Sequence, residues 1–227
     1  MGRNNSNANE IIYSKIKTML IMHEIVPGQK LQMEDLANSL KVSKTPVQSA
    51  LGILAKEGFL KLLPNKGYYA KDVTSEEITE LYQIRESLEI LSIKNAISNS
   101  TSQSIDRLQD KKLAYENILK GSFGRNVFMY DMNFHLELAE IGRNRNLTTL
   151  LKQILERVYF TSKLDILFVK EGLDICESHE EIFDAIKCKN IDKAINCIRN
   201  HLRLGRDYLL NGVQMRKEFL KMNGVDS

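Results

Sequence analysis

The sequence has no run of 18 apolar residues and few cysteines. Because a membrane-spanning helix needs about 20 consecutive apolar residues, no transmembrane segment and no membrane partner are expected. Residues 1–9 are rich in Asn and Ser and lack the apolar stretch of a signal peptide. Three cysteines, with no Cys-x-x-Cys pair, argue against a disulfide framework. We therefore expect a soluble, cytoplasmic protein, with reduced thiols packed between helices at Cys176, Cys188 and Cys197.

Proline and net charge are also scarce, and both are unevenly distributed. All three prolines lie in the first 64 residues, so little interrupts helices beyond them. The first 74 residues contain ten Lys and Arg against six Asp and Glu, whereas the other 153 contain 22 against 23. A basic first third is compatible with a nucleic-acid module carried by a near-neutral second domain. The length of 227 residues suits two modest domains, which we place at 1–73 and 74–227.

The second domain is predicted to be an antiparallel bundle of about six helices. From Ser75 onward, apolar residues recur at the spacing of a helix. Thr74 and Glu77 have the spacing of a capping box, which predicts a long helix from Ser75 to about Asn99. The remaining helices should be separated by breaks at 100–102, 121–124, 142–146, Gly172 and 189–190.

The first domain has the pattern of a winged helix-turn-helix, so the fold class is expected to be mainly α. Two short helical patterns are separated by only three residues, which is helix-turn-helix spacing. Ser43 stands where it can cap the second of them. The expected elements are a helix over 10–23, a turn at Pro27-Gly28, helices over 33–40 and 44–57, and strands over 59–63 and 68–70 around a turn at 64–67.

Two segments of this domain are candidates for DNA contact. The helix over 44–57 must bury its apolar stripe, which leaves polar side chains exposed near its N-terminus, the end that enters the major groove in this motif. The turn at 64–67 forms the wing tip, where a glycine allows close approach to the DNA backbone or minor groove. The alternative is a winged domain whose polar surface serves protein contacts. The candidate residues are Lys44, Thr45, Gln48 and Ser49 on the helix, and Lys66 and Gly67 on the wing.

Residues 31–73, "LQMEDLANSLKVSKTPVQSALGILAKEGFLKLLPNKGYYAKDV", resemble the DNA-binding domain of the GntR family of bacterial transcription regulators. The "VSKTPV" core and the "PNKG" wing carry the resemblance. Family members usually have Arg where this chain has Lys44 and Gln48, and often Glu where it has Ser49. Because Gln cannot reproduce the paired hydrogen bonds of Arg to guanine, the operator sequence is expected to differ.

Four titratable side chains fall on helical stripes that should be buried. Asp131 and His135 are one turn apart on an otherwise apolar stripe, and His179 and His201 lie on two further stripes. A buried, ionised Asp is costly unless it is paired, so three helices that direct polar groups inward need a common partner. One oxygen and three nitrogen donors suit zinc, nickel, manganese or iron, and not calcium. The alternative is that each histidine is satisfied separately in the core.

Residues 75 to about 211 resemble the FCD ligand-binding domain of the FadR branch of the GntR family. The resemblance rests on "RESLE" at 85–89 and on "HLELAEIGRNRNL" from His135 to Leu147. Many such domains bind a divalent transition metal through an Asp-x3-His pair and two later histidines, which match Asp131, His135, His179 and His201. The resemblance also implies that Arg85 faces an effector cavity and pairs with a carboxylate. From spacing alone, Arg85 can equally form a helix salt bridge to Glu89.

These features predict a DNA-binding transcriptional regulator, acting as a repressor, that responds to a small organic acid. Specific affinity generally needs two winged modules, so we expect a homodimer on palindromic double-stranded operator DNA. Two alternatives remain open. A metal held by three His and one carboxylate can activate water, as in a metal-dependent hydrolase, or it can be purely structural. Neither a catalytic residue nor a general base is evident, so no enzyme activity is expected.

Overall fold

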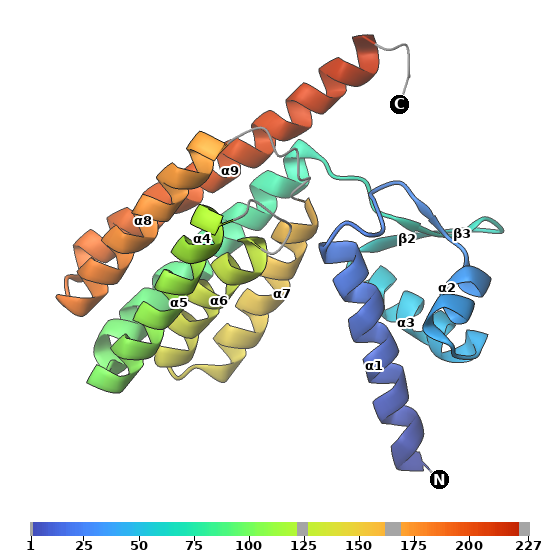
Figure 1. Cartoon of the computed structure of the whole chain (residues 1–227), viewed down its shortest axis with the longest axis horizontal. Helices are drawn as coiled ribbons and strands as arrows, with labels where there is room; N and C mark the ends of the chain where they lie inside the picture. Colours follow the sequence, from blue (N-terminus) through green and yellow to red (C-terminus); the bar gives the residue numbers. More distant parts are fainter. Residues whose placement is uncertain (1, 122–126, 162–168, 223–227) are drawn as a thin grey trace. The chain divides into compact units, whose positions relative to one another are not determined.

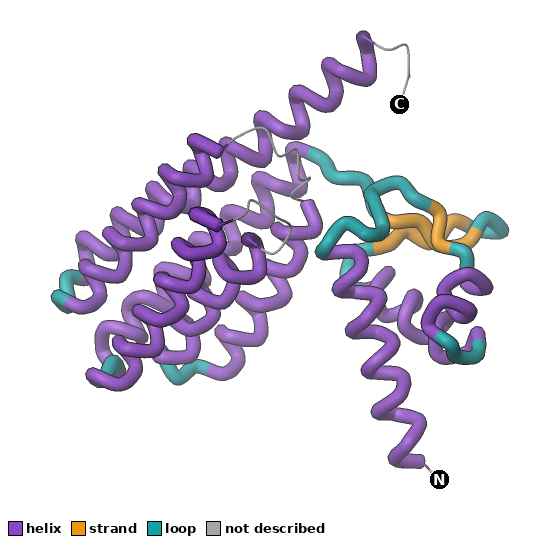
Figure 2. The backbone as a smooth tube through the Cα atoms, in the orientation of Figure 1, coloured by secondary structure: helices purple, strands orange, loops and turns teal. Residues whose placement is uncertain are grey.

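The computed structural model describes residues 2–121, 127–161 and 169–222. The chain divides into two compact units, Met1–Val73 and Thr74–Ser227. Helices dominate both units, and the strands of the described residues all lie in the first unit (Figure 2). The predicted mainly α class, with a winged helix-turn-helix followed by a helical bundle, is confirmed.

The first unit contains three helices and a small antiparallel sheet (Figure 1). Its strand order is β1-β3-β2, so the predicted two-stranded hairpin gains a third strand, β1, which pairs with β3. A two-residue strand is too short to show a period in the sequence. The elements are α1 (Gly2–Ile21), β1 (Lys30–Leu31), α2 (Met33–Leu40), α3 (Lys44–Lys56), β2 (Leu60–Leu63) and β3 (Gly67–Ala70).

Helix α3 packs against α1, α2 and β2 and forms the centre of this unit. The turn before α3 is made by Lys41, whose left-handed backbone (φ 56°) ends α2. Ser43 occupies the N-cap position of α3, but its side chain makes no capping hydrogen bond, so that part of the prediction is wrong. The core residues include Ile12, Ile16 and Leu20 from α1 and Val47, Ala50, Leu51 and Leu54 from α3.

The second unit contains six helices in its described residues, as predicted. Helix α4 lies against α6, α7, α8 and α9, and α5 lies against α6 and α8 (Figure 1). The predicted break at Gly172 is wrong, because this residue lies inside α8; one glycine costs a helix only about 1 kcal/mol. The helices are α4 (Ser75–Asn99), α5 (Ser102–Gly121), α6 (Val127–Ile141), α7 (Arg145–Thr161), α8 (Val169–Lys187) and α9 (Ile191–Met222).

Local interactions set where these helices begin and how closely they approach. The Thr74 hydroxyl accepts a hydrogen bond from the Glu77 backbone N–H at 3.1 Å, which confirms the predicted start of α4. The Glu77 carboxylate pairs with Arg157 of α7. At the end of α6, a Cβ on Gly142 would lie 2.9 Å from the Cβ of Asn95, so only glycine lets α6 approach α4 this closely.

The cysteines differ from the expectation of buried packing. Cys188 lies in the turn after α8 and is exposed, so its predicted place in the helix packing is wrong. Cys197 is half-buried on α9, and both thiols are free. The side chain of Cys176 lies outside the described residues. Within the described ranges, no helix is long and apolar enough to cross a membrane.

Candidate DNA-contacting surface and metal centre

The N-terminal turns of α3 present polar side chains to solvent. Burial of Val47 and Ala50 against the core leaves the other side of the helix free. Lys44 forms an ion pair with Glu34 of α2, in which its Nζ lies 3.2 Å from Oε1 of Glu34. Among the described residues, no other predicted residue of α3 forms an ion pair. No spacing in the sequence predicts the pair of Lys44 with Glu34. All four predicted α3 residues, Lys44, Thr45, Gln48 and Ser49, are exposed.

The wing is a tight turn between β2 and β3. Asn65 has a left-handed backbone (φ 60°), and Gly67 has φ 92°, a conformation that side-chain-bearing residues rarely adopt. A Cβ added at Gly67 would meet no atom within 4 Å, so the glycine is required by the backbone and not by crowding. Lys66 stands exposed at the tip. The turn therefore offers a positive charge on a narrow projection.

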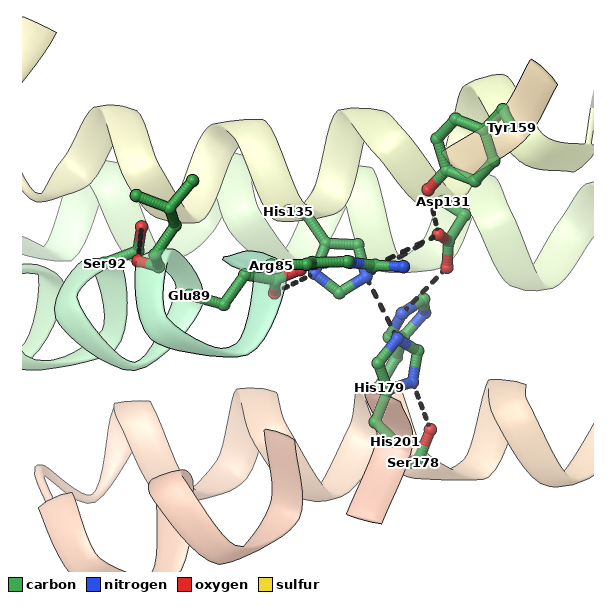
Figure 3. A network of polar contacts seen from close by, with 10 residues as sticks. Arg85, Glu89, Ser92, Asp131, His135, Tyr159, Ser178, His179 and His201 are labelled. Atoms are coloured by element: carbon green, nitrogen blue, oxygen red, sulfur yellow. Dashed lines mark hydrogen bonds and ion pairs between the residues drawn. The ribbon is translucent and has the colours of Figure 1, made fainter. Parts of the chain in front are cut away.

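The four predicted metal ligands come together inside the second unit (Figure 3). Asp131 and His135 extend from α6, His179 from α8 and His201 from α9. Each is at least 93% buried, and one ligand atom from each lies within 4.8 Å of all the others. Three helices thus deliver one carboxylate and three imidazoles to one point in the core.

The distances within the cluster suit ligands of a single ion. Nε2 of His135 lies 3.1 Å from Nε2 of His201 and 3.6 Å from Oδ2 of Asp131. Nε2 of His179 lies 3.1 Å from Oδ1 of Asp131. With metal–ligand bonds of about 2.0–2.2 Å, two ligand atoms in adjacent positions are separated by about 3 Å. The observed separations are close to that value.

The hydrogen bonding of the cluster is incomplete without a cation. Among the described residues, Nδ1 of His179 is buried and has no hydrogen-bond partner, and Nε2 of His179 and Oδ1 of Asp131, which lie 3.1 Å apart, form no well-aligned hydrogen bond. Such groups cost free energy unless a partner compensates for the lost water. A divalent transition metal would be that partner for His179 and Asp131, and the donor set of one oxygen and three nitrogens suits it. The residues present therefore fit a bound metal.

Three of the four ligands are also held from outside the cluster. Nδ1 of His135 lies 2.6 Å from Oε2 of Glu89, and Nδ1 of His201 lies 2.8 Å from Oγ of Ser178. The Tyr159 hydroxyl donates to Oδ2 of Asp131. Sequence reasoning missed all three outer contacts. Glu89 had a visible signal, since it lies four residues after Arg85 and shares its helix face, but the tyrosine and the serine follow no pattern.

Arg85 forms the helix salt bridge that its spacing allows, and its role toward an effector stays a prediction. Its Nε donates to Oε1 of Glu89 at 2.6 Å, so the helix salt bridge exists. The pair is buried, however, and the guanidinium lies over the ring of Tyr82. One terminal nitrogen of Arg85 has no hydrogen-bond partner among the described residues and lies 3.9 Å from Oδ2 of Asp131. The salt bridge therefore leaves part of the guanidinium directed toward the cluster.

Burial and neighbouring charges set the protonation of the cluster. Burial lowers the pKa of His179 and, together with the adjacent imidazoles, holds the pKa of His201 well below its usual value. Burial alone would raise the pKa of Asp131, but His135 and His179 keep it well below the ordinary range. For His135, the effect of burial is outweighed by Glu89 and Asp131, and the pKa is raised. The same carboxylates that favour a proton at His135 would favour a metal cation.

Comparisons with known proteins give the chain a family. The FCD domain matches residues 80–204, more than half of the chain, and the gntR family of bacterial regulatory proteins matches residues 8–69. The chain belongs to the GntR family and carries an FCD domain. The predicted family is thereby confirmed. GntR regulators bind operator DNA and act as dimers, and FCD domains commonly bind metal.

Relatives of this GntR-family chain are transcriptional regulators. The Nta operon transcriptional regulator of Aminobacter aminovorans is 32% identical over 147 residues, which cover 65% of this chain and 70% of that protein. The transcriptional repressor RspR of Escherichia coli is 25% identical over 202 residues, 86% of each chain. The structure of E. coli McbR/YncC covers 90% of this chain and 98% of its own at a TM-score of 0.80 and 20% identity, which shows a shared fold. The chain is thus a regulator and not a hydrolase.

Proposed function

We propose that this GntR regulator is a repressor of the FadR branch, and that a metal-bound carboxylate effector controls its affinity for operator DNA. The observation that carries the proposal is the buried cluster in which Asp131, His135, His179 and His201 place ligand atoms within 4.8 Å of one another. The repressor role is supported by the relative RspR, which is named a repressor. Because its target is DNA, the protein is proposed to act in the cytoplasm.

The proposed metal is a divalent transition ion such as zinc, nickel, manganese or iron. Bound there, it would act as a Lewis acid for oxygen ligands. The four protein ligands would fill four positions, and an octahedral ion would have two more, which would suit the two oxygens of a carboxylate or hydroxy acid. The partly unpaired guanidinium of Arg85 points to the same region and favours an anion there. Both groups therefore favour a small organic acid as the effector.

The proposed link to DNA uses the helices that carry the ligands. An effector that binds the centre contacts groups fixed to α6, α8 and α9 at once. It alters operator affinity only if the dimer has two arrangements that bind the effector with different affinities. A coupling free energy of about 1–3 kcal/mol, which is 5–150-fold in operator affinity, is the usual scale for such a link.

We propose that α3 reads the DNA bases and that the wing positions the protein on the DNA backbone. Lys44, Thr45, Gln48 and Ser49 would face the major groove, and Lys66 and Gly67 would lie against the DNA backbone. One winged module contacts only about 600–1,000 Å² of DNA, so two modules in a homodimer are proposed to bind a palindromic site. Sedimentation should show a dimer at micromolar concentration. A monomer whose operator affinity is unchanged on dilution would contradict this assembly.

The metal link is tested with one variant and one matched control. Elemental analysis of purified protein should find about one transition metal per chain. His179→Ala should lower that metal content sharply. In a gel shift with the chain's own upstream DNA, the variant should still bind the operator. A panel of mono-, di- and tricarboxylates should no longer release it from the operator. His23→Asn changes the histidine outside the cluster and should behave as wild type. If carboxylates still release metal-free protein from the operator as fully as they release wild type, any bound metal has only a structural role.

A further inference from the structure

Glu89 occupies an unusual position for a charged residue. It lies on α4, its side chain is completely buried, and its two carboxylate oxygens have different partners. Oε1 accepts from Nε of Arg85 at 2.6 Å, and Oε2 lies 2.6 Å from Nδ1 of His135 (Figure 3). One carboxylate therefore joins an arginine on its own helix to a proposed metal ligand on α6.

The contact with Glu89 determines which nitrogen of His135 is available to a metal. An ionised carboxylate only accepts hydrogen bonds, so Nδ1 of His135 must carry the hydrogen of this short contact. Nε2 is then the nitrogen with the lone pair, and it faces Nε2 of His201 and Oδ2 of Asp131. A hydrogen bond of this kind fixes the tautomer and orientation of a metal-binding imidazole and raises its basicity.

A second buried glutamate in the same unit shows what an ordinary ion pair looks like here. Glu137 of α6 accepts from Nε of Arg107 at 2.9 Å, and its side chain is 8% exposed. Arg107 is half exposed, so that pair lies at the surface of the unit, and among the described residues Glu137 forms no hydrogen bond or ion pair with the ligand set although it lies on the same helix as His135. Glu89 has the same bond to an arginine Nε, but it directs its other oxygen at His135. That second contact is the feature that packing alone does not require.

We infer that Glu89 is a positioning residue of the metal centre. It holds His135 in the Nδ1–H tautomer with Nε2 toward the cluster, and it ties this ligand to Arg85. The proposed metal ligand and the proposed effector-facing arginine therefore share one carboxylate. This inference rests on the proposed metal site and adds a residue outside the ligand set to it.

The decisive variant is Glu89→Gln, which keeps the size of the side chain. A Gln has one acceptor oxygen, so it satisfies either His135 or Arg85 and places its amide NH2 against the other donor. Loss of such an outer contact typically lowers metal affinity by about 10–100-fold. We expect a loss of this size in the Zn²⁺ affinity of the full chain, measured by competition with a chromophoric chelator. The matched control Glu137→Gln removes the charge from the ordinary pair and should bind Zn²⁺ within about threefold of wild type.

Two further measurements separate positioning from charge and from folding. Glu89→Asp keeps the charge but is one methylene shorter, so it should lose affinity as Glu89→Gln does; wild-type affinity would mean that charge alone matters and would overturn the inference. In the Zn²⁺-loaded wild type, ¹⁵N shifts of His135 should show a protonated Nδ1 and a metal-bound Nε2. The opposite tautomer would overturn the inference without any Glu89 variant. If wild-type protein binds no metal, the proposed function fails first; if it binds metal and Glu89→Gln binds it equally well, only this inference fails.

Discussion

The two units place their functional polar groups in opposite ways. In the winged unit, the candidate DNA-contacting side chains of α3 and the wing are exposed, and the buried face of α3 is entirely apolar. In the helical unit, Arg85, Glu89, Asp131 and the three histidines are buried together. A surface that binds DNA needs its charges in water, where the DNA can reach them. A site for a small ion needs them in the interior, where the ion replaces water.

This difference determines how strongly each group depends on its neighbours. An exposed lysine that loses its partner is still solvated, so each residue of the DNA surface can change almost independently. In the interior, removal of one member leaves another charge without compensation. The inner cluster is therefore expected to tolerate single substitutions poorly, and the exposed polar side chains of the outer surface are expected to tolerate them well. Four substitution experiments test that contrast, in order of decreasing effect.

The largest effect is expected for Arg85→Met in metal-free protein. The substitution removes the donor to Oε1 of Glu89 and leaves this oxygen of a buried carboxylate facing an apolar side chain, while Oε2 keeps its contact with His135. Breaking a buried pair in this way typically costs about 3–5 kcal/mol. Urea unfolding followed by far-ultraviolet circular dichroism should show this loss in the free energy of unfolding. Lys44→Met, which breaks the exposed pair with Glu34, is the control and should cost less than about 1 kcal/mol. Equal losses would remove the distinction between the two units.

The sequence predicted the elements whose pattern is long and periodic. The bounds of α2 and of α4 are those expected, because the apolar repeat and the start signal at Thr74 coincide with the folded helix ends. Strand β1 and the continuity of α8 through Gly172 were missed. A two-residue strand has no period, and a single glycine does not overcome the packing of a long helix.

The metal-ligand set could be predicted from the sequence, whereas most of the residues around it could not. Asp131 and His135 were identifiable because a charged residue on an apolar stripe contradicts the pattern around it. Glu89 was recognised as a partner of Arg85 but not of His135, because contacts across helices have no fixed spacing in sequence. Tyr159 and Ser178 are compatible with ordinary helix positions, so nothing in the sequence distinguishes them. Their part in the cluster depends on how α7 and α8 pack.

A second test compares a glycine from each unit. Gly142→Ala places a Cβ 2.9 Å from the Cβ of Asn95, and overpacking of this kind costs about 1–3 kcal/mol. Gly67→Ala meets open space but must adopt φ 92°, with a cost of about 1–2 kcal/mol from backbone strain. The two costs have different origins. In double-mutant cycles with Asn95→Gly, only Gly142→Ala should show coupling; additivity at both sites would contradict the crowding argument.

The third test asks whether the outer residues have separable functions. Gln48→Ala should weaken binding to the operator by about 1–3 kcal/mol where the side chain reads a base, and should leave binding to random duplex unchanged. Lys66→Ala should weaken both alike and lower the slope of log affinity against log salt by about one. Fluorescence anisotropy with both duplexes across a salt series measures these quantities. If Gln48→Ala weakens binding to the operator and to random duplex equally, the Gln48 side chain does not read bases.

The smallest effect is expected from the pair on the outer surface. Lys44 and Glu34 are 61% and 69% exposed, so their attraction contributes little, about 0.2–1 kcal/mol, to folding. Glu34 is an acidic group beside a lysine that is proposed to face DNA, and its charge opposes the approach of phosphate. Glu34→Gln should therefore leave the unfolding midpoint almost unchanged and tighten DNA binding several-fold at low salt, with the gain disappearing as salt screens the interaction. The matched control is Glu24→Gln, an exposed acidic residue outside the α2–α3 pair, which should leave affinity unchanged. Equal tightening by both variants would assign the effect to net charge and not to release of Lys44.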